Sequence, residues 1–116
     1  MTVIYVLLGA HFVGDFICQS DWMAQNKSKR WDALALHVLI YSAVLGLFLL
    51  WPPPTDAALL FVGVNGAAHF AQDAITSRIN SRLWAAKQVH WFFVGIGADQ
   101  LLHYVTLFVT AGWWLR

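Results

Sequence analysis

The sequence contains no glutamate, one cysteine and few charged residues, and each shortage excludes a class of protein. Its 116 residues are 11% charged, whereas a soluble domain is about a quarter charged. Without glutamate, the chain has neither a His-Glu-x-x-His metalloprotease helix nor an EF-hand loop. The single cysteine, Cys18, excludes an intrachain disulfide and a multi-cysteine zinc site. The formal net charge of +1 removes the electrostatic case for binding nucleic acid. With 59% hydrophobic residues in so short a chain, we expect an integral membrane protein.

Four segments are long and apolar enough to predict membrane-spanning helices. The predicted fold is all-α, a single four-helix membrane bundle over residues 1–116. Its spans cover about residues 2–18, 33–51, 57–75 and 91–115. The three prolines, all at 52–54, predict a tight hairpin between the second and third spans, because proline does not continue a helix.

The positive charges and the tryptophans indicate how the bundle is oriented. Six of the seven lysines and arginines lie in the connections 20–32 and 76–90. The positive-inside rule places both connections in the cytoplasm and both termini outside. Tryptophans flank both ends of the spans, as in interfacial aromatic belts. In the second connection an apolar residue recurs every fourth position beside two arginines, which fits either a short interfacial helix or a solvated basic loop. These residues are Ile75, Ile79 and Leu83 with Arg78 and Arg82.

One short motif occurs twice. Ala10-His11-Phe12-x-x-Asp15-x-Ile17 returns 58 residues later as Ala68-His69-Phe70-x-x-Asp73-x-Ile75. Both copies close an odd-numbered span, so both point the same way through the membrane. The repeat is typical of two duplicated helix pairs related by an axis along the membrane normal, with coincidence as the alternative.

Three aspartates lie within the predicted spans, where each costs roughly 2.5–3.5 kcal/mol on insertion scales. Each has a histidine four residues away, on the same helix face. The pairs are His11 with Asp15, His69 with Asp73, and Asp99 with His103. A further histidine, His37, lies one turn into the second span. Because ionisable groups inside membranes are usually functional, we expect the bundle to gather these side chains in its cytoplasmic half.

Imidazole and carboxylate groups bind zinc, manganese and iron, so the cluster predicts one or two divalent ions, with zinc ahead of manganese or iron. The candidate ligands are His11, Asp15, His37, His69, Asp73, Asp99 and His103. Gln19, Asn65 and Gln100 are the candidates for orienting those ligands from outside. The alternative is a set of His–Asp hydrogen bonds that clip the helices together without a metal.

The first functional hypothesis is a metal-dependent hydrolase. A bound metal lowers the pKa of a coordinated water, and Asp15, Asp73 and Asp99 are the candidate catalytic residues, one spare acid or imidazole acting as general base. The basic connections would attract anionic lipid head groups, which suggests a lipid or phosphoester substrate. The alternatives are a proton or metal-ion transporter or channel, and a non-catalytic accessory protein with a structural metal. Glycines in the spans allow close approach of helices, so a homo-oligomer is also possible.

Three polar motifs follow one another along the chain: His11-x-x-x-Asp15-x-x-x-Gln19, His69-x-x-x-Asp73 and Asp99-Gln100-x-x-His103. In that order they resemble a family of small bacterial and phage multi-pass membrane proteins catalogued as a domain of unknown function. The resemblance covers nearly the whole chain. It implies a multi-pass protein of the bacterial inner membrane but no particular activity. A weaker similarity, in ligand type alone, connects the motifs to inner-membrane proteins described as metal-dependent hydrolases.

Overall fold

The described part of the chain, residues 2–49 and 56–114, contains helices and turns and no strand in the computed structural model. The predicted all-α class is therefore confirmed. Its elements are α1 (Thr2–Phe12), the π-helix η1 (Val13–Ile17), α2 (Asp21–Asn26), α3 (Trp31–Phe48), α4 (Asp56–Ala85) and α5 (Val89–Trp114).

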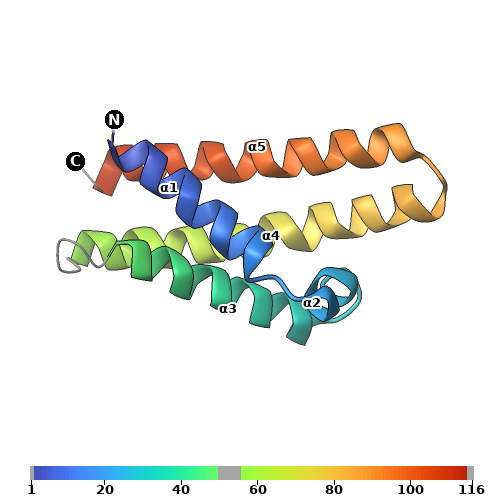
Figure 1. Cartoon of the computed structure of the whole chain (residues 1–116), viewed down its shortest axis with the longest axis horizontal. Coiled ribbons are helices and arrows are strands. Elements are labelled where there is room, and N and C mark those ends of the chain that lie inside the picture. Colours follow the sequence, from blue (N-terminus) through green and yellow to red (C-terminus); the bar gives the residue numbers. More distant parts are fainter. Residues whose placement is uncertain (1, 50–55, 115–116) are drawn as a thin grey trace.

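The long helices run antiparallel in chain order (Figure 1). The start of α1 and the end of α5 lie at one end of the molecule, which measures 46 × 26 × 20 Å. The short helix α2 and the turn between α4 and α5 lie at the other. We call the latter the basic end, because six of the seven cations belong to its segments. They are Lys27, Lys29, Arg30, Arg78, Arg82 and Lys87.

The helix α4 extends ten residues beyond the predicted span, and this corrects the prediction for the connection that follows it. Residues 76–85 form neither a separate interfacial helix nor a loop; they are the last turns of α4. Residues 67–85 contain no glycine or proline to end a helix. The helix stops in a Schellman motif: the Gln88 N–H donates to the Leu83 carbonyl, and Lys87 has a φ of 58°. The predicted proline hairpin lies outside the described residues.

The first predicted span changes helix type in its last third. The α-helix α1 gives way to the π-helix η1, and the Cys18 N–H donates to the Val13 carbonyl at 2.9 Å. Such π segments are frequent at functional sites, and this one carries Asp15. The second copy of the repeat stays α-helical within α4, so the two copies share residues but differ in backbone geometry.

The burial pattern combines a cluster of buried polar side chains with many large apolar side chains on the outside. His11, His37, His69 and Asp73 are all at most 1% exposed, while Leu39 of α3 is 67% exposed. Many other large apolar side chains on the outer faces of the helices are exposed as well. By length and composition, α3 and α5 are apolar enough to cross a membrane, and residues 3–17 form a shorter apolar helix.

Candidate metal centre

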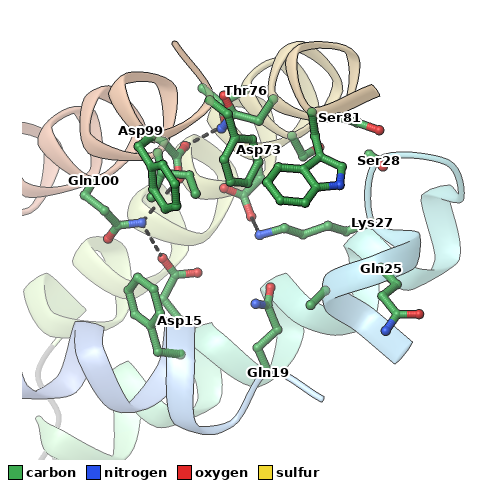
Figure 2. A pocket seen from close by; sticks show the side chains of 18 of the residues that line it. Asp15, Gln19, Gln25, Lys27, Ser28, Asp73, Thr76, Ser81, Asp99 and Gln100 are labelled. Carbon is green, nitrogen blue, oxygen red and sulfur yellow. Dashed lines mark hydrogen bonds and ion pairs between the residues drawn. The ribbon is translucent and has the colours of Figure 1, made fainter. Parts of the chain in front are cut away.

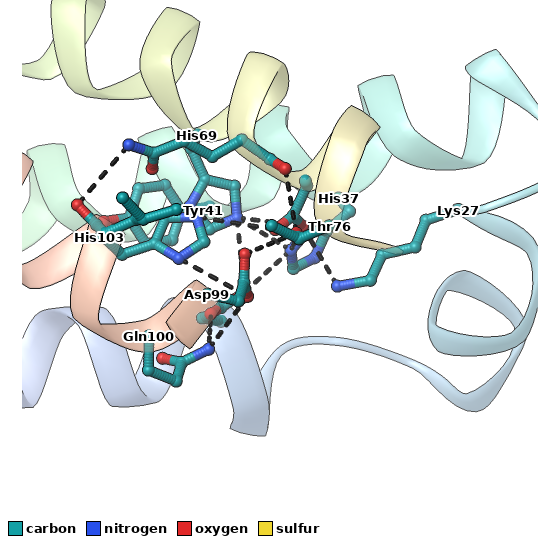
Figure 3. Close-up of polar contacts among 12 residues, drawn as sticks. Lys27, His37, Tyr41, His69, Thr76, Asp99, Gln100 and His103 are labelled. Carbon is teal, nitrogen blue, oxygen red and sulfur yellow. Dashed lines mark hydrogen bonds and ion pairs between the residues drawn. The ribbon is translucent and has the colours of Figure 1, made fainter. Parts of the chain in front are cut away.

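Four buried side chains from three elements bring their ligand atoms together inside the bundle, and Figure 3 shows the two histidines among them, His37 and His69. The four are Asp15 of η1, His37 of α3, and His69 and Asp73 of α4. The Nε2 atom of His37 lies 2.9 Å from Asp15 Oδ1, 3.1 Å from His69 Nε2 and 3.3 Å from Asp73 Oδ2. The Nε2 atom of His69 lies 3.3 Å from Asp15 Oδ1 and 3.4 Å from Asp73 Oδ2. We call these four residues the central group.

Five of the six distances within the central group are close to the edge length of a small coordination tetrahedron. A tetrahedral zinc with ligands at about 2.0–2.1 Å has ligand atoms separated by about 3.3 Å. The five separations above run from 2.9 to 3.4 Å. Two imidazole nitrogens and two carboxylate oxygens are also a suitable donor set for zinc. The residues of the central group therefore fit one such ion.

The second oxygens of Asp15 and Asp73 face the remaining candidates. Asp15 Oδ2 lies 3.4 Å from His11 Nε2, and Asp73 Oδ1 lies 3.5 Å from His103 Nε2. His103 Nδ1 is in turn 3.6 Å from Asp99 Oδ2. The three predicted i, i+4 pairs thus all lie close, and they merge into one cluster because Asp15 and Asp73 each present an oxygen to two partners. His37, predicted from its depth alone, lies at the centre.

Hydrogen bonds from neighbouring side chains hold this cluster in place. Gln100, a predicted orienting residue, accepts from His11 Nε2 at 2.7 Å and donates to Asp15 Oδ2 at 3.2 Å. The hydroxyl of Tyr41 lies 3.2 Å from His11 Nδ1, and its ring stacks on His69 with centroids 4.1 Å apart. Thr76 donates its hydroxyl to Asp99 at 2.6 Å. Tyr41 and Thr76 were not among the predicted site residues, because neither repeats at a motif spacing.

The other two predicted orienting residues, Asn65 and Gln19, each lie four residues from a member of the central group in the sequence. Asn65, one turn before His69, donates to Thr110 Oγ1 at 2.8 Å and so ties α4 to α5. Gln19, just after η1, has a buried Oε1 with no hydrogen-bond partner among the described residues.

The most informative residue that sequence reasoning missed at the site is Lys27. It follows α2 at the basic end, where the sequence suggests only a loop cation that attracts head groups. Its side chain instead turns inward, is 17% exposed, and places Nζ 3.1 Å from Asp73 Oδ2 (Figure 2). No spacing signal marks this residue, because the loop before α3 is what brings it over the cluster.

A cavity of about 670 Å³ connects the cluster with the basic end. Asp15, Asp73, Asp99 and Gln100 line its inner part, and Lys27 reaches across it (Figure 2). On the opposite side of the cluster, a mainly apolar group packs the bundle. That group, the outer core, comprises Leu7, Ala10, Tyr41, Leu45, Phe61 and Leu107, all at most 2% exposed. The cluster is therefore reached from the basic end.

Comparison with known proteins places the chain in a family. A family model described as "Protein of unknown function (DUF3307)" matches residues 3–115. The chain belongs to this family, as the resemblance of its motifs to a domain of unknown function predicted. No curated protein and no solved structure matches it significantly. None of these findings bears out the weaker similarity to metal-dependent hydrolases.

Proposed function

We propose that the chain is a membrane-embedded, metal-dependent hydrolase whose ion is bound among Asp15, His37, His69 and Asp73. The observation that carries this proposal is the convergence of four buried ligand atoms, with five of their six separations between 2.9 and 3.4 Å. Zinc is the first choice because two nitrogens and two oxygens in a tetrahedron suit it. Manganese and iron accept the same ligands and are the alternatives.

The membrane placement is part of the proposal. Residues 1–116 form one four-span domain in the bacterial inner membrane, with the basic end in the cytoplasm and both termini outside. Apolar outer faces and a polar interior support this placement, as do the two helices apolar enough to span. Four tryptophans at the basic end are 45–60% exposed, as expected of an interfacial belt. They are Trp22, Trp31, Trp84 and Trp91.

The residues around the central group divide into distinct roles. A catalytic zinc keeps one position for a water, so three of the four residues of the central group would hold the ion, and it would lower the pKa of that water towards neutrality. Asp99 is the best candidate for general base, because it lies outside the central group, lines the cavity, and is held by Thr76. His11 is best suited to orientation, since Tyr41 and Gln100 engage both of its ring nitrogens.

A second ion has a candidate position beside the first. Asp73, Asp99 and His103 bring three further ligand atoms within 4.8 Å of one another. Asp73 belongs to both groups, so the residues of the cluster could hold a pair of ions, as in two-metal hydrolases. The donor set thus supports one or two ions.

The alternatives have less support. A transporter or channel needs polar groups through the whole membrane thickness, whereas on the side away from the basic end the outer core packs the bundle around one buried polar pair, Asn65 with Thr110. An accessory protein with a purely structural metal has no need of a cavity, yet three carboxylates of the cluster line one. The cavity therefore favours a site that a substrate reaches.

Hydrolysis of bis(p-nitrophenyl) phosphate by detergent-purified, zinc-loaded protein tests this function. Asp99→Asn should retain the ion but lose about 100-fold or more in rate, as expected when a general base is removed. Asp21→Asn, at an exposed position of α2, is the matched control and should hydrolyse at the wild-type rate. Equal rates for Asp99→Asn and Asp21→Asn, or no hydrolysis by the zinc-loaded wild type, would contradict the proposal.

A further inference from the structure

We infer that the cavity binds a phosphorylated lipid, with Lys27 holding the phosphate and the aromatic side chains at the rim holding the chain. This inference narrows the substrate of the proposed hydrolase and rests on that function. It is carried by three observations: the inward-facing lysine, the unpartnered polar atoms of the wall, and the apolar rim.

Three aspartates line the cavity, so binding of an anion depends on positive charge from Lys27 and Lys29, which also line it, and from the proposed ion. The ammonium of Lys27 pairs with Asp73 Oδ2, the same oxygen that belongs to the central group. When an ion takes that oxygen, the ammonium loses a partner while remaining over the cavity. Lysine is a compact phosphate-binding cation, so Lys27 and the ion together offer two positive groups to one phosphate.

Uncharged groups of the wall indicate that the ligand also carries hydroxyls. Among the described residues that line the cavity, Gln19 Oε1 and Ser77 Oγ are buried without a hydrogen-bond partner. The amide oxygen accepts hydrogen bonds and needs a donor, and the hydroxyl can donate or accept. A glycerol or sugar phosphate supplies such donors, whereas a fully ionised phosphate does not.

The rim of the cavity is apolar and continues into the outer surface of the bundle. Phe16 of η1, Trp84 of α4 and Phe93 of α5 line it and are 45%, 59% and 61% exposed. A water-soluble phosphoester gains little from such a rim, whereas an acyl chain does, because it stays in apolar surroundings while its head group enters. A volume of about 670 Å³ lies within the range of about 300–1,000 Å³ for small-molecule sites.

Binding of dioleoyl phosphatidylglycerol, whose head group carries a phosphate and two free hydroxyls, to the zinc-loaded protein in detergent micelles tests the inference. The wild type should bind this lipid at least about tenfold more tightly than dioleoylglycerol, glycerol 3-phosphate or inorganic phosphate. Lys27→Gln should lose about tenfold, as expected for one charge-assisted hydrogen bond, and Lys27→Arg should restore part of it. Arg82→Gln, which removes a cation of the same end that does not line the cavity, should bind like the wild type.

A second pair of variants tests the apolar part. Trp84→Ala should weaken lipid binding severalfold, whereas Trp91→Ala, equally exposed but away from the cavity, should not. Equal binding by wild type and Lys27→Gln, or glycerol 3-phosphate binding as tightly as the lipid, would overturn the inference. Metal content measured on the same samples separates the two proposals. Protein that holds zinc but shows no Lys27-dependent lipid binding contradicts this inference alone, and protein without zinc that still shows it contradicts the hydrolase alone.

Discussion

The imidazoles of His37 and His69 face each other through the same ring atom, with their Nε2 atoms 3.1 Å apart. Two neutral nitrogens at this distance repel if both present lone pairs, so a proton or a cation must lie between them. Asp15 and Asp73 place one oxygen each within 3.4 Å of both nitrogens. Two acids beside two facing imidazoles favour a divalent cation over a single proton, because a cation also offsets the cost of burying the carboxylates.

Removal of the ion should lower thermal stability. A ligand that binds only the folded state contributes about 2.7 kcal/mol when its free concentration is 100 times Kd. We therefore expect a chelator to lower the melting temperature of wild type and of His90→Ala, which changes an exposed histidine outside the cluster. His37→Ala should melt at the same temperature with and without chelator. A chelator shift in His37→Ala as large as that of wild type would place the ion elsewhere.

Gly14 should be intolerant of a side chain, because η1 packs closely on α3 there. A Cβ at this position would lie 3.1 Å from Tyr41 Cδ2 and 3.4 Å from its Cα. We expect Gly14→Ala to lower the free energy of unfolding by about 1–3 kcal/mol through overpacking, and to weaken metal binding by displacing the ring that stacks on His69.

Gly9→Ala is the control for that substitution, since a Cβ at Gly9 of α1 meets nothing within 4 Å. It should be neutral or stabilise the helix by up to about 1 kcal/mol. Denaturation in detergent measures both variants. Equal stability of Gly14→Ala and Gly9→Ala would show that the packing of η1 against Tyr41 is not tight.

The hydroxyl of Tyr41 should contribute modestly to stability and little to metal affinity. Tyr41→Phe keeps the ring that stacks on His69 but removes the hydrogen bond to His11. The expected loss is about 1 kcal/mol of unfolding free energy, with metal content unchanged. Tyr5→Phe, at a position 70% exposed, should change neither. If Tyr41→Phe protein holds no metal, the expectation is contradicted. His11 would then be a metal ligand that the hydrogen bond from Tyr41 holds in place.

Membrane orientation is testable by cysteine labelling. In a Cys18→Ala background, Gln88→Cys marks the basic end and Trp113→Cys the opposite end. A membrane-impermeant maleimide added to intact spheroplasts should label Trp113→Cys, and it should label Gln88→Cys only after the membrane is opened. The reverse pattern would contradict the proposed orientation, and labelling of both in intact spheroplasts would contradict a spanning protein.

Local sequence spacing predicted the parts of the site that lie on one helix. The pairs at i and i+4 are close because helix geometry alone brings them together, as His69 and Asp73 show. A continuous α4 was also within reach of the sequence, since no glycine or proline follows Gly66 before Ala85. Arg78 and Arg82 suggested that the helix ends with the membrane span at residue 75, but arginine does not end a helix.

The contacts between elements were not predictable from spacing. Lys27 reaches Asp73 from a loop, and Tyr41 reaches His11 from the face of another helix. Their positions depend on how the helices pack against one another, and the periodicity of a single helix carries no information about that packing. The change to a π-helix at Val13 was likewise not predictable from spacing, because it occurs where Gly14 packs closely against Tyr41 of another helix.

The metal content of purified protein tests the central claim most directly. Elemental analysis should find one or two equivalents of zinc, manganese or iron in wild type and in His90→Ala, and less than a tenth of that in His69→Ala and in Asp73→Asn. Circular dichroism of the same samples verifies that each variant is folded. Two results would contradict a metal centre built on His37 and His69. One is folded wild-type protein that holds no transition metal, either as purified or after incubation with zinc. The other is His69→Ala protein with the full wild-type metal content.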